Sequence, residues 1–320
     1  MDCSRLLVIG DVNIDIIIQG LENIPEMGQE TFVDNIFMRV GGGAANTAIG
    51  LSKLECNTAL CGALGDDSIS RLVVGELQHA GIDLRYMAIH KDLPTGISVS
   101  ISTGGDRLFI SSAGASLMVN PDAISTAELK QFSHVHFSAW NPRQSLAAYS
   151  ETAKRAHKMG CTVSFDIGWT DGEWNRWELF DMLQETDVFF PNLIEARNIF
   201  GNMAECDELG SYFLKHVRDI VVITNGANGA TAYGKNGEKY WDSYKANAID
   251  AVGAGDAFNA GFLSAYVCGK PLQQCLSYGC AAGSVAVSRV GGGASAPSRE
   301  ELIAITASHC ADTKAILHKT

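Results

Sequence analysis

The sequence lacks the features that mark several classes of protein. Its nine cysteines include no C-x-x-C pair, and no cluster of histidine and cysteine has the spacing of a zinc site. Several of the cysteines lie in apolar runs, where a free thiol behaves as a small hydrophobe. The first apolar run ends at Asp11, too early for a signal peptide, and no later run reaches the length of a membrane span. We therefore expect a reduced, cytoplasmic protein that contacts no membrane.

Positive charge is scarce, with 24 Lys and Arg against 36 Asp and Glu and a net charge of −12. A strongly acidic surface repels phosphate backbones, so nucleic acid is not an expected partner. Charged residues make up only 19% of the chain, and there are no charge blocks, repeats or low-complexity tracts. With 320 residues, 46% of them hydrophobic, and 33 glycines, the composition is typical of a compact α/β enzyme.

Apolar runs of strand length alternate with helical patterns along most of the chain. Candidate buried strands lie at 6–10, 58–62, 134–138, 161–166, 187–190 and 220–224. Helical patterns lie between several of them, at 44–54, 72–80 and 145–158. Continuous apolar strands that alternate with helices predict an α/β fold with a mostly parallel central sheet flanked by helices.

Two regions break this alternation and predict a small antiparallel β lid. Residues 96–102 alternate strictly between apolar and polar, and a turn separates them from a second short run at 107–111. Residues 14–18 and 31–40 also have strand character without an intervening helix. The apolar face of such a sheet must be covered by substrate, by the main domain or by a second subunit.

These patterns give provisional domain boundaries. The large α/β nucleotide-binding and catalytic domain is expected to comprise 1–11, 41–94 and 112–320, and the small lid 12–40 and 95–111.

The most informative stretch is 247–266, N-A-I-D-A-V-G-A-G-D-A-F-N-A-G-F-L-S-A-Y. Apolar residues recur with helical spacing from Asp256 onward, so Gly253, Ala254 and Gly255 stand at a helix start. Small residues there let backbone N–H groups approach an anion, which the helix dipole also favours. A carboxylate at Asp256 makes sense if the site also removes a proton from an attacking hydroxyl. Taken alone, the motif is equally consistent with a glycine turn followed by an acidic first-turn residue.

A second motif supports the functional interpretation. Residues 250–258, D-A-V-G-A-G-D-A-F, resemble the C-terminal signature D-[TS]-x-G-A-G-D-x-F of the ribokinase-like, or PfkB, family of carbohydrate kinases. Residues 41–48, G-G-G-A-A-N-T-A, resemble the family's N-terminal signature G-G-x-x-x-N-x-A. The resemblance covers nearly the whole chain. It implies a ribokinase-like fold and an ATP-dependent phosphotransferase acting on a hydroxyl of a small sugar that is ribose-, fructose- or sugar-acid-like.

The resemblance also implies roles for individual residues. Asp256 would be the general base, and Gly253, Ala254 and Gly255 would form the anion hole for the transferring phosphoryl group. The chain has no G-x-x-x-x-G-K-[ST] loop, so backbone dipoles would stabilise the charge in place of a P-loop lysine.

The nucleotide loop is expected after the strand at 220–224. Residues 224–229, T-N-G-A-N-G, resemble the family's T-x-G-x-x-G loop, although in isolation they also fit an ordinary turn. The segment 290–294 and Cys280 are expected to border the adenine pocket. The nucleotide-binding residues implied by the resemblance are Asn192, Thr224, Gly226, Gly229, Gly255 and Cys280.

Two cation sites are implied. Asn192 and Glu195 match the family's N-x-x-E motif and would bind Mg²⁺ through water, since hydrated Mg²⁺ needs few protein oxygens. An N-cap with an acidic first turn fits these two residues equally well. A possible K⁺ site would use Asp250, Val252, Ala286, Arg289, Gly291 and Ser295.

The sugar is expected to bind near the first lid strand. The resemblance assigns sugar hydroxyls to Asn13, Asp15 and Asn46, with Gly41 and Gly42 allowing close contact and Asp256 completing the pocket. An Asx turn is the plainer interpretation of residues 13–15.

Departures from the family bear on the identity of the sugar. Ribokinases and phosphofructokinases often have Lys where Gly43 stands, which disfavours a phosphorylated sugar. Asp166 lies in a partial match to D-x-N-x-R and is a further candidate contact. Trp140, Asn141 and Arg107 are weaker candidates, better explained by packing or by a solvated turn.

The alternatives to a sugar kinase differ in the motifs that they require. An oxidoreductase would need G-x-G-x-x-G after the first strand, and Gly10-Asp11-Val12-Asn13 lacks it. A non-catalytic sugar- or nucleotide-binding regulator would be expected to lose the base or the anion hole, and both are intact. A nucleoside kinase remains the alternative to a sugar kinase. The lid disfavours the vitamin-kinase branch, and dimerisation is common among lidded relatives, so a homodimer through the lid is expected.

Overall fold

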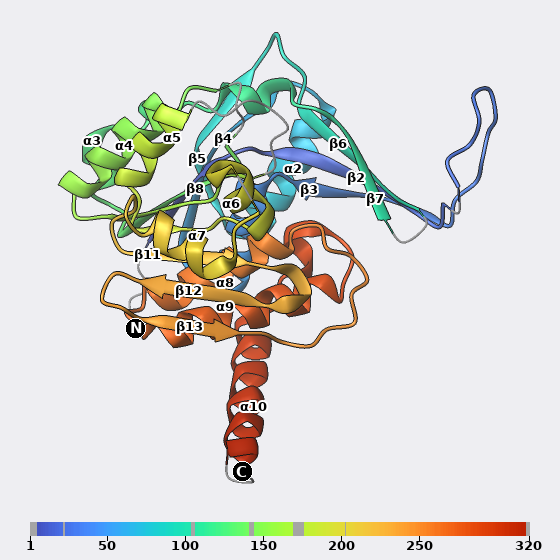
Figure 1. The fold of residues 1–320 in the computed structure, drawn as a ribbon. Helices are drawn as coiled ribbons and strands as arrows, with labels where there is room; N and C mark the ends of the chain where they lie inside the picture. The colour runs from blue at the N-terminus through green and yellow to red at the C-terminus, as the bar shows by residue number, and fades with distance from the viewer. Residues whose placement is uncertain are drawn as a thin grey trace.

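The computed structural model describes residues 5–21, 23–103, 106–140, 144–168, 176–201 and 203–317. Within them the chain forms a nine-stranded sheet, in the order β13-β12-β11-β10-β9-β8-β1-β4-β5, and a four-stranded sheet, in the order β3-β2-β6-β7. Figure 1 shows the smaller sheet projecting from one side of the body that the larger sheet and its helices form. The expected fold class is confirmed.

The central sheet is parallel except at one edge. Its parallel strands are β1 (Leu6–Gly10), β4 (Thr58–Gly65), β5 (Asp83–His90), β8 (His134–Ser138), β9 (Thr162–Phe165), β10 (Val188–Phe189) and β11 (Ile220–Thr224). Strands β12 (Ala230–Gly234) and β13 (Lys239–Asp242) pair antiparallel to extend the edge beyond β11. The sequence analysis predicted β1, β8 and β11 at these bounds. It did not predict β5, β12 and β13. The residues of β5 and β13 are partly exposed, so these two strands lack a continuous apolar run.

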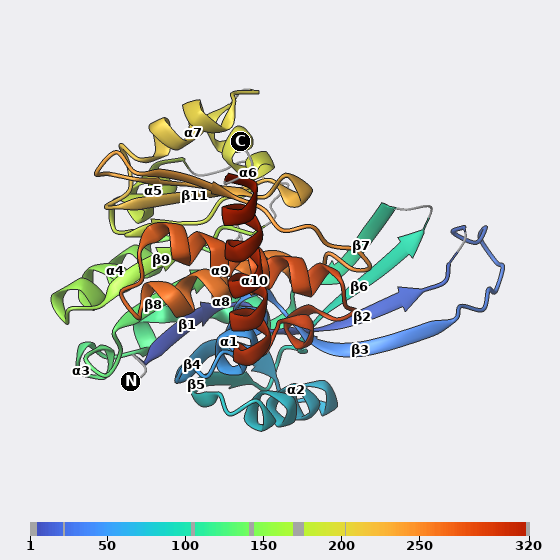
Figure 2. The ribbon, with the colours of Figure 1, turned by 90° about the horizontal axis from the view of Figure 1, so that it is seen from below.

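Helices cover both faces of the central sheet, because its strands are apolar on both sides. In β1, Leu6 and Val8 pack with one group of helices, and Leu7 and Ile9 pack with the other. The first face carries α1 (Gly43–Lys53), α2 (Ser68–His79), α8 (Ala254–Tyr266), α9 (Leu272–Val287) and α10 (Arg299–Leu317). The second carries α3 (Thr126–Leu129), α4 (Ala147–Lys158), α5 (Arg176–Gln184), α6 (Leu193–Phe200) and α7 (Cys206–Phe213). Figure 2 shows α1, α8, α9 and α10 gathered on one side.

Close helix packing seats α8 against its neighbours. A side chain at Gly261 would lie 2.5 Å from the carbonyl oxygen of Tyr278 on α9, and one at Gly50 on α1 would lie 2.8 Å from Cβ of Ala260. Glycine at both positions lets α8 lie between α1 and α9 at short distance. The start of α8, where the predicted base stands, is thereby fixed relative to α1.

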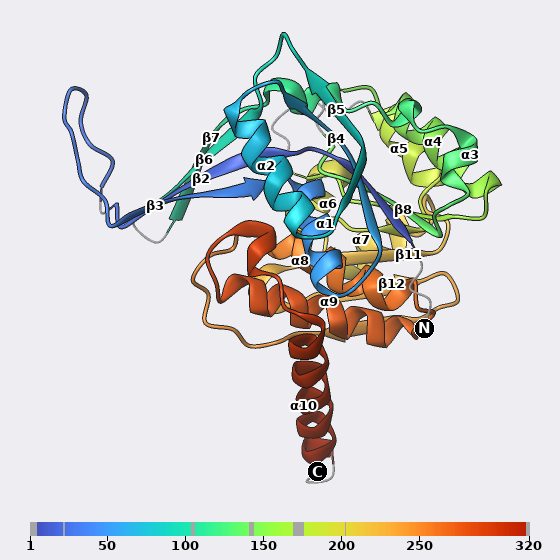
Figure 3. The same ribbon diagram turned by 180° about the vertical axis from the view of Figure 1, so that it is seen from behind.

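The lid consists of β2 (Asn13–Gln19), β3 (Asn35–Gly41), β6 (Gly96–Thr103) and β7 (Asp106–Ser112). Its outer pairs, β2–β3 and β6–β7, are antiparallel, and β2 and β6 join them in parallel. In this register Asn13 lies beside both Gly41 and Gly96. Figure 3 shows α2 beside the base of this sheet, where the strands enter the main body.

Short 3-10 turns complete the chain, at η1 (Gly114–Met118), η2 (Pro121–Ala123), η3 (Gly226–Asn228) and η4 (Gly292–Ser295). None of the described helices is both long and apolar enough to cross a membrane.

Candidate active site

Polar residues, two of them predicted from the sequence, gather where the parallel strands end. Asp11 follows β1, Ser138 ends β8, Asp166 follows β9 and Thr224 ends β11. In parallel α/β sheets the carboxyl ends of the strands are the usual place for a ligand. The start of α8 and the base of the lid meet the sheet at this same edge.

The anion-hole turn at the start of α8 has the geometry that its glycines predict. Gly253 is the N-cap, with φ of 74°, in the left-handed region that favours glycine. A Cβ at this position would lie 2.7 Å from Cα of Gly292. At Gly255, by contrast, a Cβ would meet nothing within 4 Å, so the space beside the first turn of α8 is open. The N–H of Ala254 donates to the carbonyl oxygen of Ala251 at 3.3 Å, which leaves the N–H groups of Gly255 and Asp256 for an anion.

Asp256 lies in that first turn, next to the diglycine segment. Nδ2 of Asn46 donates to its Oδ2 at 3.0 Å. A Cβ at Gly43 would lie 3.2 Å from its Oδ1. Burial raises the pKa of Asp256 well above its ordinary value, and the charge of Asp166 raises it further, while the hydrogen bond from Asn46 opposes both. The two sequence signatures, 210 residues apart at Asn46 and Asp256, therefore meet in one site.

Asn46 has a role that the sequence did not indicate. Its Oδ1 accepts from the backbone N–H of Gly293 at 2.8 Å, in addition to the bond that its Nδ2 donates to Asp256. One N–H of the amide is left for a sugar hydroxyl, the contact expected from the sequence. The side chain thus links α1, α8 and the loop after α9.

Asn13, Asp15 and Gly41 lie together at the base of the lid. A Cβ at Gly41 would lie 2.3 Å from Oδ1 of Asp15 and 2.4 Å from Oδ1 of Asn13, so only glycine fits between them. Gly42 has φ of 92° and would place a Cβ 2.5 Å from the carbonyl oxygen of Asp11. Burial raises the pKa of Asp15 to about 7, and the neighbouring charge of Asp11 adds to the effect.

Two buried polar atoms at this place have no protein partner among the described residues. They are Oδ1 of Asn13 and Oγ of Ser138. A buried polar atom without a hydrogen bond is costly, so both fit a ligand that carries hydroxyl groups. Ser138 lies 3.0 Å from the position of a Cβ at Gly43. Sequence reasoning missed Ser138, although its position at the end of a predicted buried strand was a usable signal.

Two further carboxylates surround the base. Asp11 accepts from the N–H of Ala44 at 3.2 Å, and burial raises its pKa to about 6. Asp166 accepts from Nδ2 of Asn259 at 2.6 Å, and burial raises its pKa to about 6. Asp166 was a candidate from the sequence, whereas Asp11 and Asn259 were missed. Asn259 lies one turn beyond Asp256 on α8, and only the folded structure brings it to Asp166.

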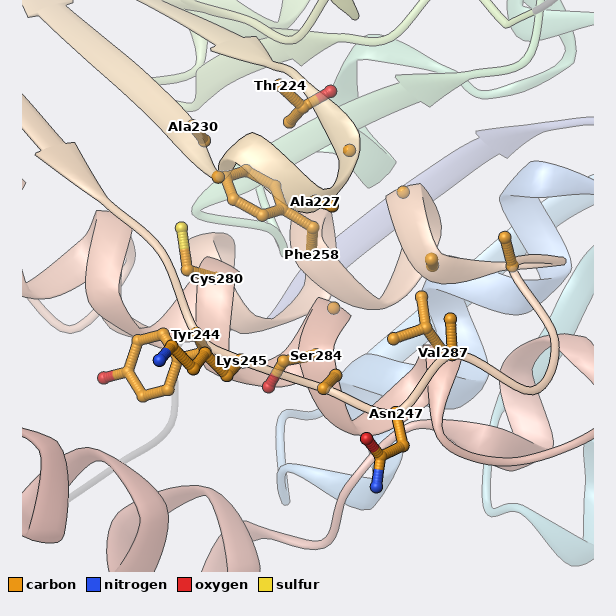
Figure 4. A pocket seen from close by; sticks show the side chains of 18 residues that line it. Thr224, Ala227, Ala230, Tyr244, Lys245, Asn247, Phe258, Cys280, Ser284 and Val287 are labelled. Carbon is orange, nitrogen blue, oxygen red and sulfur yellow. The ribbon is translucent and has the colours of Figure 1, made fainter.

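A cavity of 740 Å³ opens next to the anion-hole turn. Figure 4 shows Thr224 and Ala227 on one wall, Phe258, Cys280 and Ser284 from α8 and α9, and Tyr244, Lys245 and Asn247 along the rim. Its volume suits a nucleotide-sized ligand. Five of the six residues expected to bind nucleotide line it, namely Thr224, Gly226, Gly229, Gly255 and Cys280.

The expectation that 290–294 borders an adenine pocket stays a prediction. None of these residues lines the cavity, whereas Cys280 does. The chain turns after α9 toward α1, so Gly292 and Gly293 pack against Gly253 and Asn46 instead. Segment 244–248, to which the sequence analysis gave no role in nucleotide binding, lines the cavity instead.

Asn192 and Glu195 form a capping box at the start of α6. Oδ1 of Asn192 accepts from the N–H of Glu195, and Oε2 of Glu195 accepts from the N–H of Asn192, both at 2.9 Å. Asn192 also forms an isolated bridge with Thr224, beside the cavity. Burial raises the pKa of Glu195 to about 8, and the charge of Asp166 raises it further. The capping-box interpretation of this motif is therefore correct, and the Mg²⁺ interpretation stays a prediction.

The two segments predicted for K⁺ come together. Asp250 is 3% exposed, and its carboxylate accepts from the N–H of Val252 at 2.9 Å and of Gly291 at 3.3 Å. Ser295 is also buried, and its Oγ donates to the carbonyl oxygen of Gly292 at 2.5 Å. The N–H of Arg289 donates to the carbonyl oxygen of Ala286 at 3.1 Å. The guanidinium of Arg289 pairs with Glu301 at 2.8 Å.

Of the three weaker candidates, Trp140 has a side chain that the structure describes. Trp140 is buried, and its Nε1 donates to the carbonyl oxygen of Gln144 at 2.9 Å, which is a packing role. Asn141 and the side chain of Arg107 lie outside the described residues.

The model of the family described as "pfkB family carbohydrate kinase" matches residues 4–299 of this chain. The chain belongs to this family. The family assignment and the expected enzyme class, a sugar kinase that transfers a phosphoryl group to an alcohol, are thereby confirmed.

Relatives of several sugar specificities cover almost the whole chain. The "ATP-dependent ribose-1-phosphate kinase" of Halopiger xanaduensis is 30% identical over 301 residues, covering 94% of this chain and 97% of that protein. The "5-dehydro-2-deoxygluconokinase" of Halalkalibacterium halodurans is 27% identical over 286 residues, covering 83% of this chain and 85% of that protein. The solved structure of a Methanocaldococcus jannaschii nucleoside kinase superposes with a TM-score of 0.80 at 25% identity, covering 96% of this chain and 99% of that one.

Proposed function

We propose that this pfkB-family kinase transfers the γ-phosphoryl group of ATP to a hydroxyl of a ribose-like sugar, with Asp256 as the general base. The observation that carries the proposal is the position of Asp256. It lies in the first turn of α8, between the open space at Gly255, where the cavity ends, and the polar groups at the base of the lid. A nucleotide in the cavity and a polyol at Asn13 and Asp15 would meet at this carboxylate.

The residues of the site account for each part of the proposed transfer. The carboxylate of Asp256 accepts the proton of the attacking hydroxyl, and the N–H groups at the start of α8 receive the charge on the migrating phosphoryl group. Asn13, Asp15 and Ser138 orient the sugar through hydrogen bonds to its other hydroxyls. The glycines at 41 and 42 keep the sugar within reach of the base.

The proposed site also binds Mg²⁺ and K⁺. Asn192 and Glu195, with Asp166 beside them, would hold Mg²⁺ through water, and the metal supplies positive charge to the phosphates when bound. The raised pKa of Glu195 supports this, because two neighbouring buried carboxylates are stabilised by a cation. The segments of Asp250, Val252, Ala286, Arg289, Gly291 and Ser295 would hold K⁺ beside the anion-hole turn.

The decisive experiment measures ADP release across a panel of pentoses, hexoses, ketoses, sugar acids, sugar phosphates and nucleosides. A ribose-like sugar is expected to give the highest kcat/KM. Asp256→Asn should lower kcat by about 10²–10⁴-fold and leave ATP binding intact. Near-normal turnover in this variant would remove the proposed base. A preference for nucleosides would favour the alternative kinase, and binding without turnover would favour the regulator.

A sugar phosphate is the second candidate, supported by the name of the Halopiger relative and by Arg39. Arg39 is the cross-strand neighbour of Asp15 in the lid, and a Cβ at Gly291 would lie 3.4 Å from Cγ of its side chain. A guanidinium there could bind a phosphate group on the sugar. It would take the role of the lysine that some relatives have where this chain has Gly43. Arg39→Gln should raise KM for ribose 1-phosphate about tenfold and leave KM for ribose unchanged if this candidate is correct.

We further propose that residues 12–40 and 95–111 act as one lid and that its apolar face joins two copies of the chain. The register places apolar residues of all four strands on that face, and three of them are well exposed, Ile36 at 61%, Met38 at 43% and Ile110 at 63%. A contiguous exposed apolar face on a sheet supports a second copy as its cover. ATP as substrate and the free thiols of the described cysteines support action in the cytoplasm.

A further inference from the structure

The loop Gly291–Ala296 lies between the two parts of the proposed catalytic machinery. On one side Gly292 packs against the anion-hole turn, since a Cβ at Gly253 would lie 2.7 Å from its Cα. On the other side the N–H of Gly293 donates to Asn46, which in turn donates to Asp256. A displacement of this loop would therefore reach both the anion hole and the base.

Asn46 transmits the position of the loop to the base. The side chain is 4% exposed, and its planar amide is bonded at both ends, to Gly293 at 2.8 Å and to Asp256 at 3.0 Å. A rigid amide held at one end places the donor at the other end. A Cβ at Gly292 would come within 2.8 Å of Oδ1 of Asn46, so the loop has no space to move toward α1 without disturbing this residue.

Lys53 holds the same loop from the other end. It is the last residue of α1, two helical turns after Asn46 and on the same side of the helix. Its Nζ donates to the carbonyl oxygen of Ala294 at 2.7 Å and also to that of Ala296. Burial, and then the nearby charge of Arg289, lower the pKa of Lys53, whereas Glu301 opposes them. A half-buried ammonium that donates to two carbonyl groups is well placed to fix them.

We propose that Lys53 is a positioning residue for phosphoryl transfer: it fixes the loop Gly291–Ala296 so that Gly293 stays on Asn46 and Asn46 stays on Asp256. Lys53 is absent from the lining of the cavity, and among the described residues its hydrogen bonds go to the loop alone. It therefore acts through the loop and not by contact with substrate. The inference rests on the proposed role of Asp256 as base.

The test compares Lys53→Met with Lys158→Met. Lys158 is likewise the last residue of its helix, α4, and is exposed on the opposite face of the sheet. In Lys53→Met the hydrogen bond from Asn46 should weaken, which removes stabilisation of the Asp256 carboxylate. We expect kcat to fall about tenfold, the acid limb of the pH profile to move up by about one pH unit, and KM for ATP to change less than about twofold. Lys53→Arg should restore most of the activity, and Lys158→Met should match the wild type.

The pH profile separates positioning from stability alone. The charged groups that face Asp256 are Asp166, Asp11 and Asp15, and the substitution leaves all of them in place. A lower Tm with an unchanged pH profile would overturn the proposal, as would full activity in Lys53→Met. If Lys53→Met does not fold, Lys53→Gln replaces it under the same criteria.

A readout that does not depend on turnover keeps this inference distinct from the proposed function. The side-chain carboxyl ¹³C signal of Asp256 can be titrated in the wild type and in both lysine variants. An upward shift of the Asp256 titration in the Lys53 variant supports the positioning role of Lys53 even if no sugar on the panel is phosphorylated. An unshifted titration overturns it even if the enzyme is active.

Discussion

At the scale of single residues, the site is held in a conformation that its own charges oppose. Asp11, Asp15, Asp166, Glu195 and Asp256 all have raised pKa values, chiefly because burial disfavours their ionised forms. The proposed base must nevertheless be ionised to act, so the proposed mechanism requires the state that folding disfavours. Such a cluster is consistent with stability given up for function at an active site.

Asp256→Asn should therefore stabilise the ligand-free protein. The unfolded carboxyl ionises near its ordinary pKa of 3.8, and the folded one only at a much higher pH. Stability from this group is fully present below that ordinary pKa and is lost as pH rises through the folded pKa. The gain in Tm over the wild type should be small near about pH 5 and several degrees near about pH 8, because each kcal/mol moves Tm by about 2 °C in a chain this long.

Differential scanning fluorimetry at the two pH values measures this gain. Asp66→Asn, at an exposed carboxylate, is the control and should shift Tm equally at both. A lower Tm for Asp256→Asn at the higher pH would contradict the expectation.

At the scale of elements, the start of α8 separates two roles of glycine that look alike in the sequence. Gly253 is required by its positive φ and by its contact with Gly292, whereas Gly255 has ordinary backbone geometry and open space beside it. The motif G-A-G-D gives no hint of this difference. The first glycine shapes the turn, and the second leaves open space for the proposed anion.

Gly253→Ala and Gly255→Ala should consequently fail in different ways. Gly253→Ala should lower stability by roughly 1–3 kcal/mol and abolish activity, because alanine is strained at φ of 74° and collides with Gly292. Gly255→Ala should keep or raise Tm, since alanine favours a helix by about 0.5–1 kcal/mol, yet should lower kcat because its methyl group fills the anion space. Thermal unfolding and ADP release on both variants provide the check. Full activity in Gly255→Ala would show that the phosphoryl group lies elsewhere.

The central strands contain a second element with a predictable pH response. His134 and His136 on β8 are fully buried, and Nε2 of His134 and Nδ1 of His136 both contact Oγ of Ser164 at 2.7 Å. Burial lowers the pKa of each to about 3, from an ordinary value of 6.5. A base with a lowered folded pKa contributes stability that is present above its unfolded pKa and is lost as pH falls below it, because the unfolded state then binds more protons.

His136→Leu should therefore reduce the sensitivity of the fold to acid. Each buried histidine costs roughly 1.4 kcal/mol of stability between about pH 7.5 and pH 5.5. The loss of unfolding free energy over this range, measured by urea titration, should shrink by that amount in the variant. His79→Gln, at an exposed histidine in the last turn of α2, should leave it unchanged. An identical loss in His136→Leu and the wild type would refute the assignment of a low pKa to His136.

At the scale of the whole molecule, the lid gives one face to the site and leaves the other uncovered. Asp15, Ser98 and Ser111 share one face through the strand register, and Ile36, Met38 and Ile110 share the opposite face. A single copy of the chain leaves the second set exposed. The proposed dimer would cover these side chains and fix the lid over two sites at once.

Ile110→Lys should yield a monomer if that face joins two copies. A buried apolar contact would become a charge without a partner, which an interface of this kind does not tolerate. Light scattering with size-exclusion chromatography gives the mass, and Phe109→Lys, one residue away on the opposite face and 56% exposed, is the matched control. A wild type that is already monomeric at micromolar concentration would remove the proposed interface.

The sequence by itself determined the fold class, the positions of β1, β8 and β11, and the two signatures that contain Asn46 and Asp256. These features depend on local patterns, namely continuous apolar runs, helical periodicity and glycines next to polar residues, which are readable along the chain. The capping box of Asn192 and Glu195 is equally local.

Only the tertiary structure decided how these pieces meet. It placed Asn259 on Asp166 and gave Asn46 a bond to Gly293. It also left the loop Gly291–Ala296 outside the lining of the cavity and brought Lys53 to this loop. Each of these contacts joins residues far apart in the chain, so no local spacing encodes them. They follow from the close approach of α1, α8 and α9 at their glycines, which depends on packing in three dimensions.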